Sequence, residues 1–194
     1  MSYHYYLLHK PFGYLSQFTG EPDDLLLGSL YPFPKDVYSV GRLDKDSEGL
    51  LLLTNDNRLK TRLLNPRSLH TKTYWVQVEG DITSDAIALL ESGNITISHN
   101  GKLHLVYPAI CKKINAPDIP ERVPPIRFRA EIPTSWIELT ITEGKNRQVR
   151  KMTAAAGFPT LRLIRSAIGK IQLGELAPGK VIEIAEDKVT AVFK

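Results

Sequence analysis

Four consecutive leucines, Leu50–Leu53, constrain the fold more than any other feature of this 194-residue chain. A polar loop that begins at Gly41 precedes them, and Thr54 follows. A strand with one solvent-exposed face alternates apolar and polar residues. A continuous apolar run is instead typical of a strand that is packed on both faces. The run therefore predicts a strand buried on both faces. The chain is long enough to cover it with one sizeable core or two small lobes.

Other segments predict further strands. Tyr74, Val76 and Val78 share one face of an alternating segment over 73–78, and a second segment over 136–142 alternates in the same way. Asn100-Gly101 is typical of a hairpin turn. Residues 3–14 are expected to form a strand that runs into a Pro/Gly turn, and residues 160–184 form strand pieces.

Helices are expected to be few and short. We expect one within 20–36, one over 55–65 with Asn55 or Asp56 as its N-cap, and one over 85–90. The last begins at an Asn146 cap, runs through Ala156 and closes at Gly157. The proline-rich stretch 115–134 should be irregular. Together these patterns predict an α+β fold with a mixed, largely antiparallel sheet.

Composition excludes several classes of protein. The single cysteine, Cys111, excludes an internal disulfide framework and a cysteine-based zinc site, and it suits a reducing compartment. No apolar run approaches the roughly 20 residues that a membrane span needs. Residues 1–6 have neither the basic region nor the apolar region of a signal peptide. The histidines lack metal-ligand spacing, and phosphate-loop and common hydrolase motifs are missing. We therefore expect a cytoplasmic protein with no bound metal.

The positive charge is concentrated in two blocks. Residues 112–170 carry 12 basic and 5 acidic side chains, although the whole chain has a net charge of only +4. A second block has no acid between Asp56 and Glu79, and it contains Arg58, Lys60, Arg62, Arg67 and Lys72. Such blocks either bind the phosphates of a nucleic acid or form a solvated surface.

Two elements could support chemistry. Asp44 lies where the polar loop enters the leucine strand, and Arg147, Arg150 and Lys151 share one face of the helix that follows residue 146. Val149 lies on the flank of that helix. If the cationic face meets Asp44, Arg150 could keep that carboxylate ionised and oriented, while the other cations bind phosphates.

These residues carry a resemblance to a known family. Gly41-Arg42-Leu43-Asp44 with the block from Glu48 to Asp56 resembles the catalytic motif of the RsuA-type ribosomal RNA pseudouridine synthases. Lys10-Pro11-Phe12-Gly13 and Lys72-Thr73-Tyr74 resemble two further motifs, and the segments 143–152 and 163–169 two more. All five occur in the order of the family and span nearly the whole chain.

The resemblance implies that uridine is isomerised to pseudouridine, without a cofactor, in the pseudouridine synthase fold with two lobes and a cleft between them. It makes Asp44 the essential carboxylate, which either attacks C1′ or assists formation of a glycal intermediate. Arg42 would enter the RNA helix where the target base leaves it, and Tyr74 would stack on the uracil. Arg150 would pair with Asp44, and Val149 would help to wall the base pocket.

The remaining cations are predicted to contact RNA phosphates: Lys145, Arg147, Lys151, Arg162 and Arg165. Members of the family often begin with an RNA-binding domain of the S4 type. This sequence does not, so residues 1–194 are expected to form one catalytic domain. The lack of an S4-type domain and the sequence of residues 146–148 most resemble members of the family that act on 23S ribosomal RNA.

Several alternatives remain open at this point. A relative of the same family could act on small-subunit RNA or on transfer RNA, and the chain could be a silent RNA-binding or ribosome-assembly factor. The expected partner is large-subunit ribosomal RNA or a preribosomal particle. We expect the protein to be a monomer and to make no contact with a membrane.

Overall fold

A computed structural model of the chain describes residues 2–65, 68, 70–126, 129 and 131–190. Two compact units divide it: unit 1 comprises Met1–His70 and Ile164–Lys194, and unit 2 comprises Thr71–Leu163. Strand β11 (Thr160–Ile168) begins in unit 2 and ends in unit 1.

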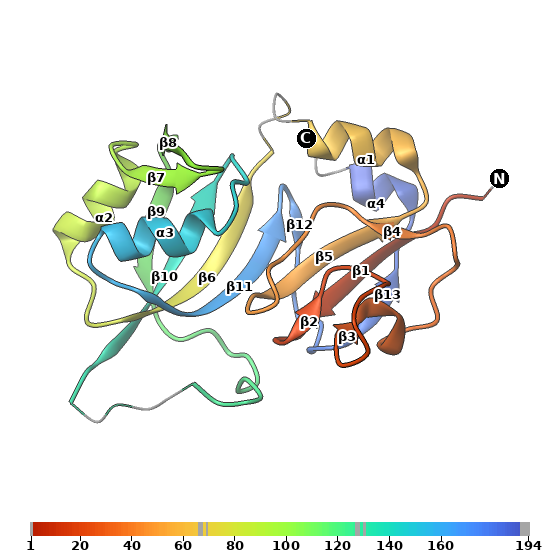
Figure 1. The fold of residues 1–194 in the computed structure, drawn as a ribbon, viewed down its shortest axis with the longest axis horizontal. Coiled ribbons are helices and arrows are strands. Elements are labelled where there is room, and N and C mark those ends of the chain that lie inside the picture. Colours follow the sequence, from red (N-terminus) through yellow and green to blue (C-terminus); the bar gives the residue numbers. More distant parts are fainter. Residues whose placement is uncertain (1, 66–67, 69, 127–128, 130, 191–194) are drawn as a thin grey trace. The chain divides into compact units, whose positions relative to one another are not determined.

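The leucine run forms the central strand of unit 1, as predicted. Every residue of β5 (Glu48–Thr54) is buried. It pairs antiparallel with all six residues of β1 (Tyr5–Lys10) and parallel with β11 (Figure 1). Three short strands complete this part of the sheet, namely β4 (Tyr38–Ser39), β12 (Ile171–Gln172) and β13 (Val181–Glu183).

A glycine at the start of β5 allows the parallel pairing. Gly49 has a φ of +105°, and a Cβ placed there would lie within 3 Å of the Arg165 backbone. Any larger residue would push β5 and β11 apart and would also hold a strained backbone. The close approach of these two strands therefore depends on this glycine.

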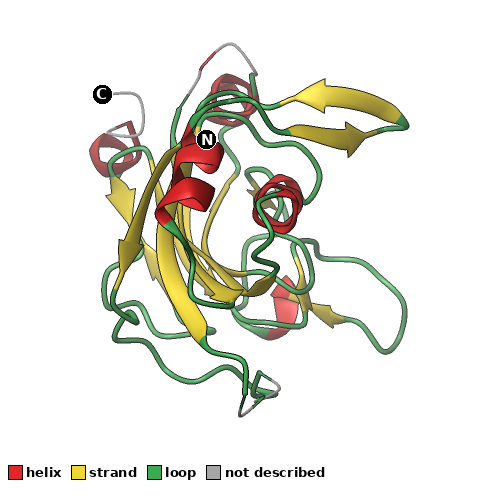
Figure 2. Ribbon diagram, turned by 90° about the vertical axis from the view of Figure 1, so that its left-hand side faces the viewer, coloured by secondary structure: helices red, strands yellow, loops and turns green. Residues whose placement is uncertain are grey.

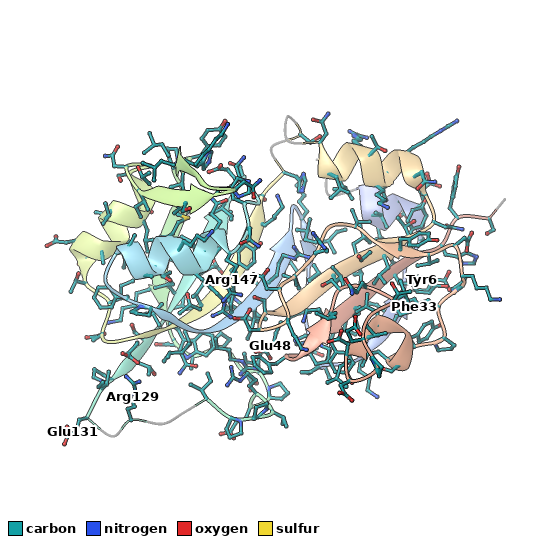
Figure 3. The ribbon with its side chains drawn as sticks, viewed as in Figure 1. Tyr6, Phe33, Glu48, Arg129, Glu131 and Arg147 are labelled. Carbon is teal, nitrogen blue, oxygen red and sulfur yellow. The ribbon has the colours of Figure 1, made fainter. Side chains whose placement is uncertain are left out.

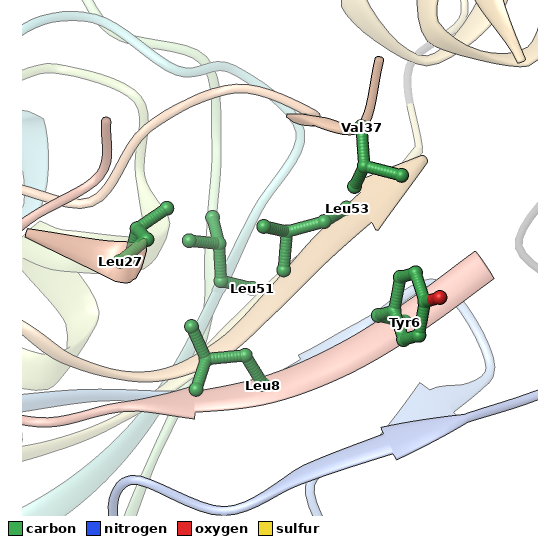
Figure 4. Packing of buried hydrophobic residues seen from close by; sticks show 6 residues of the cluster. All are labelled: Tyr6, Leu8, Leu27, Val37, Leu51 and Leu53. Carbon is green, nitrogen blue, oxygen red and sulfur yellow. The ribbon is translucent and has the colours of Figure 1, made fainter. Parts of the chain in front are cut away.

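Alternate residues of β1 and β5 build the main core of unit 1. Figure 4 shows Tyr6 and Leu8 of β1 packed with Leu51 and Leu53 of β5. Leu27 and Val37 close the cluster from the segment between the strands. This cluster accounts for the burial of the face of β5 that carries Leu51 and Leu53.

The segment that covers this core contains little helix, whereas a short helix was expected within 20–36. It contains the two-residue strand β3 (Leu25–Leu26), paired with β2 (Tyr14–Leu15), and the 3-10 turn η1 (Leu27–Ser29). Aromatic side chains fill most of its inner surface. The Phe33 ring meets Tyr6 edge to face at 5.3 Å, and both are labelled in Figure 3. Burial of these rings thus replaces helical periodicity in this segment.

Helix α1 (Asn57–Leu64) lies between β5 and β6, where the sequence predicts a helix. The Asp56 carboxylate accepts hydrogen bonds from the backbone N–H groups of Arg58 and Leu59, so Asp56 is the N-cap. Leu59 and Leu63 are buried as expected, but Leu64 remains 48% exposed. Arg67 of the predicted basic block lies outside the described residues.

Unit 2 is built on an antiparallel sheet with the predicted alternation. Strand β6 (Lys72–Glu79) pairs with β10 (Thr134–Ile141), which pairs with β9 (Ile110–Ile114). The inward side chains of β6 and β10 are buried: Tyr74, Val76, Val78, Ile137, Leu139 and Ile141.

Helix α2 (Ser84–Glu91) and the hairpin of β7 (Thr96–His99) and β8 (Lys102–Leu105) lie between β6 and β9 in the chain. The hairpin turns at Asn100 and Gly101, which both have positive φ, as the dipeptide predicts. The described part of 115–133 contains no helix or strand, which confirms its predicted irregularity.

The remaining helices are α3 (Gln148–Ala155) and α4 (Glu186–Thr190). Strands form most of the regular structure, and the helices are short (Figure 2). The predicted α+β class with a mixed, largely antiparallel sheet is confirmed. Among the described residues, no helix has the length and apolar character needed to cross a membrane.

Candidate active site

The loop between β4 and β5 carries Arg42 and Asp44. It begins at Gly41, whose φ of +74° lets the chain turn sharply after β4. The N–H of Ser47 then donates to the Asp44 carbonyl oxygen over 3.0 Å and closes a turn that leads into β5. Arg42 is exposed and Asp44 is half-buried. The carboxylate therefore stands at a strand entrance.

Both neighbours of Asp44 are anchored to the β1–β2 segment. The buried Ser16 hydroxyl donates to the Leu43 carbonyl oxygen at 2.9 Å and accepts from the Leu43 N–H at 3.0 Å. On the other side, the N–H of Gly13 donates to the Lys45 carbonyl oxygen at 2.8 Å. Fixing the backbone on both sides of Asp44 restricts where its carboxylate can point, as a catalytic group requires.

A buried lysine supplies positive charge to the same unit. Lys10, at the end of β1, is 0% exposed and donates from Nζ to the carbonyl oxygens of Pro11 and Tyr14. Burial lowers the pKa of Lys10 to about 8, and the negative charges of Glu48, Asp46 and Asp44 oppose that shift. Lys10 is thus electrostatically coupled to the acidic loop.

Lys10 was identified from the sequence only as part of the opening motif. A local signal was available, because it ends a strand whose other residues, Tyr5–His9, are all buried. A charged group in such a strand needs specific partners. Glu48, labelled in Figure 3, is also buried, at 3% exposure, and was likewise identified only as part of a motif, the block from Glu48 to Asp56.

In unit 2, Tyr74 lies on β6 opposite Leu139 of β10. Its side chain is 8% exposed and belongs to the apolar row of that strand. The adjacent Thr73 hydroxyl lies 2.9 Å from that of Thr140 across the same strand pair. The strand pairing therefore fixes the backbone from which the Tyr74 ring projects.

The loop before α3 corrects one prediction. Arg147, not Asn146, is the N-cap, and it has left-handed dihedrals of φ 53° and ψ 32° without a side-chain capping bond. The loop is closed by Gln148 instead, whose Oε1 accepts from the Lys145 N–H at 3.0 Å. The left-handed residue reverses the chain immediately before the helix, and its side chain is exposed (Figure 3).

A buried carboxylate holds this loop to the β7–β8 hairpin side of unit 2. Glu143 Oε1 accepts from the Tyr107 N–H at 2.6 Å and from Gln148 Nε2 at 3.1 Å. Its Oε2 lies 2.6 Å from His104 Nε2 on β8. Only 6% of the Glu143 side chain is exposed. The network was not predicted, since no spacing in the sequence links residues 104 and 143.

The other predicted residues of α3 lie in unit 2. Val149 is 4% exposed, and Arg150 Nη1 is 3.4 Å from the Thr160 carbonyl oxygen. Lys151 donates from Nζ to the Ser98 carbonyl oxygen of β7 at 2.7 Å. Lys151 therefore binds the hairpin and also presents charge next to the exposed Arg147.

The two arginines of β11 are more buried than phosphate contacts usually are. Arg162 is 6% exposed and donates to the Pro120 carbonyl oxygen at 3.0 Å. Arg165 is 5% exposed and donates from Nε to the Leu50 carbonyl oxygen at 2.8 Å. These bonds join β11 to its neighbours, which gives both arginines a structural role besides the predicted one.

Each unit thus brings together part of the predicted set. Arg42 and Asp44 share an anchored loop of unit 1, and Lys145, Arg147, Val149, Arg150 and Lys151 share one loop and helix of unit 2. The pairing of Asp44 with Arg150 joins residues of different units and stays a prediction. A fixed, half-buried carboxylate can act as a nucleophile or as a base, and exposed cations can bind phosphates.

Comparisons with known proteins agree on one class. The family described as RNA pseudouridylate synthase matches residues 4–155. The chain is 49% identical to the ribosomal large subunit pseudouridine synthase E of Vibrio parahaemolyticus, over 92% of this chain and 72% of that protein. It is also 49% identical to the protein of that name from Xanthomonas axonopodis pv. citri, over 89% of each chain.

The fold has a counterpart among solved structures. A structure described as a pseudouridylate synthase superposes with a TM-score of 0.77 and 26% identity, over 98% of this chain and 74% of the other. The fold expected from the sequence motifs is confirmed by this match.

Proposed function

Since the chain belongs to the RNA pseudouridylate synthase family, we propose that it isomerises one uridine of 23S ribosomal RNA to pseudouridine. The observation that carries the choice of substrate is the 49% identity to relatives named for the large ribosomal subunit. The anchored Asp44 loop supports the activity, because the reaction needs a carboxylate at a fixed position.

In the proposed reaction the bond between C1′ and N1 of the uridine breaks, and the uracil leaves as an anion. The uracil then turns within the site, and C5 bonds to C1′. The hydrogen on C5 is lost and N1 gains one, so that substrate and product are isomers and no cofactor is consumed. Asp44 would either attack C1′ or assist a glycal route.

The other residues would position the base. Chemistry on a base requires that it leave the RNA stack, and the exposed Arg42 would occupy the space it leaves. Tyr74 would stack on the extruded uracil, Val149 would line its pocket, and Arg150 would pair with Asp44. Lys145, Arg147 and Lys151 would bind phosphates, whereas the burial of Arg162 and Arg165 favours their structural role.

We further propose that the whole chain acts as one catalytic domain and as a monomer in the cytoplasm. Its single cysteine suits a reducing compartment. Sedimentation of the purified protein, with and without RNA, would test the monomer, and a stable dimer would contradict it.

The decisive test is Asp44→Asn, which keeps the size of the side chain and removes its charge. We expect no release of tritium from 23S RNA labelled at C5 of uridine, with RNA affinity nearly unchanged. Asp36→Asn, which alters an exposed carboxylate of the same unit, is the matched control and should retain activity. Substantial turnover by Asp44→Asn would refute the assignment.

The substrate is tested in cells. Mapping pseudouridines in ribosomal RNA with and without the gene should show one large-subunit position that disappears. Loss of a position in small-subunit or transfer RNA would identify a different substrate for the same chemistry. An unchanged map would favour an RNA-binding or ribosome-assembly factor.

A further inference from the structure

One side of α1 packs against residues 38–41, which precede the Asp44 loop. Lys60 Nζ lies 5.4 Å from the centre of the Tyr38 ring on β4. One helical turn later, Leu64 Cδ2 lies 3.5 Å from the position of a Cβ at Gly41. Through these contacts α1 packs beside residues 38–41 (Figure 1). Residues 38–41 immediately precede the loop that carries Arg42 and Asp44.

The side chains on this side of α1 remain accessible although they pack together. Tyr38 is 53% exposed and Leu64 is 48% exposed, and Lys60 is partly exposed. We refer to Tyr38, Lys60 and Leu64 as the Tyr38 strip. The strip therefore offers an accessible aromatic ring directly beside a cation.

Helix α1 itself carries charge of one sign. Helix α1 contains Arg58, Lys60 and Arg62 and no acidic residue. The adjacent acid, Asp56, is 9% exposed and is occupied by the N-cap and by the Tyr5 hydroxyl at 3.2 Å. The helix therefore presents three cations and no acid of its own, while the nearby Asp36 accepts a hydrogen bond from Asn55 Nδ2 at 2.8 Å. A polyanion is the complementary partner of such a helix.

We propose that the Tyr38 strip binds an unpaired nucleotide of the RNA substrate next to the target uridine, with the base on Tyr38 and its phosphate on Lys60. This inference rests on the proposed function. Unpaired bases stack on exposed aromatic rings, and lysines bind the phosphates between them. Arg42 follows Tyr38 by four positions, a reach of at most about 14 Å, so the strip can serve RNA that enters at Arg42.

The strip would thus help to select the substrate without touching the reacting atoms. A contact made equally before and during the reaction changes KM and leaves kcat unchanged. Because a ring stacks on any base, the strip would recognise an unpaired conformation rather than a particular sequence. It would favour a target uridine that has a single-stranded neighbour.

Binding to a 23S RNA transcript tests the ring. Tyr38→Leu keeps an apolar side chain but removes the stacking surface, so we expect affinity to fall about 5-fold to 150-fold. Tyr38→Phe should restore it, because the phenyl ring still stacks. Tyr3→Leu, which alters another exposed tyrosine of unit 1, is the matched control and should bind as the wild type does.

The cation is tested through salt. Lys60→Met should make the plot of log affinity against log salt concentration shallower by about 0.7 to 0.9, as expected for one lost phosphate contact. Lys35→Met, at an exposed lysine outside the strip, should change it less. Circular dichroism and thermal unfolding would verify that each variant is folded.

The outcomes separate this inference from the proposed function. If Tyr38→Leu and Lys60→Met bind the transcript as the wild type does, the strip is not an RNA contact, whatever the turnover. If both variants weaken binding while the wild type forms no pseudouridine, the strip binds RNA and the proposed function fails. A higher KM with unchanged kcat would support both.

Discussion

Replacing Glu143 with alanine should destabilise unit 2 far more than removing Glu138, a less buried glutamate of the preceding strand β10. Glu143 accepts from the Tyr107 N–H and from Gln148 Nε2, and it faces His104 Nε2 at 2.6 Å. Its side chain is 6% exposed. Alanine would leave the buried Gln148 amide and the part-buried Tyr107 N–H without their acceptor.

The magnitude follows from the donors left behind. Each buried donor without a partner costs about 1 to 3 kcal/mol. Gln148 is 3% exposed, whereas His104 is 26% exposed at its side chain and can turn toward water. Counting the buried Gln148 amide in full and the part-buried Tyr107 N–H at the lower end of this range gives a loss of about 3 kcal/mol in the free energy of unfolding.

Glu138→Ala is the matched control. Glu138 pairs with Lys112 at 2.7 Å, but the two side chains are 29% and 63% exposed. A pair of this kind contributes about 0 to 1 kcal/mol. Urea unfolding of the wild type and of both variants gives the comparison, with Glu143→Gln, which retains one acceptor, expected between them.

Equal losses for Glu143→Ala and Glu138→Ala would refute the reasoning, because burial would then not decide the contribution of a carboxylate. The loop that Glu143 holds also carries Arg147 and leads to Arg150. We therefore expect Glu143→Ala to lower pseudouridine formation at temperatures where the variant is folded.

Three further perturbations test other parts of the structure. Gly49→Ala should cost at least about 3 kcal/mol, since it combines a positive φ with a clash on the Arg165 backbone; a stable variant by thermal unfolding would contradict this. Asp56→Ala should cost about 1 to 2 kcal/mol through loss of the α1 cap and of the Tyr5 hydroxyl bond, and urea unfolding would measure it. Burial lowers the pKa of Lys10 to about 8 from its ordinary value of 10.5, so between these values the unfolded chain binds more protons than the folded one. The stability of the wild type relative to Lys10→Met should therefore rise between about pH 8 and 10.5, by about 3 kcal/mol in total; a difference that stays constant with pH would exclude this ionisation.

Local sequence patterns were sufficient to predict most of the secondary structure. The leucine run, the alternation around Tyr74 and the Asn100-Gly101 turn were interpreted correctly, because each reflects burial or a dihedral constraint within a few residues. The short helix expected within 20–36 is only the 3-10 turn η1 (Leu27–Ser29). That segment is shaped by the core that it covers, and its aromatic side chains have no period of their own.

The predicted N-cap at Asn146 failed for a related reason. A capping residue is favoured where no stronger acceptor competes, and here Gln148 and Glu143 satisfy the loop. That competition depends on where β10 ends and on the hairpin side of unit 2. Neither is visible from residues 144–148 alone.

The sequence by itself determined the class of fold, the family and the residues to test, because motifs and periodicity are local properties of the chain. Only the tertiary structure revealed the Ser16 and Gly13 anchors of the Asp44 loop, the buried charge of Lys10 and the Glu143 network. Each of these joins segments far apart in the chain, such as Ser16 with Leu43 and His104 with Glu143. Such contacts form when buried polar groups seek partners in the folded protein, and no spacing in the sequence encodes which partner they find.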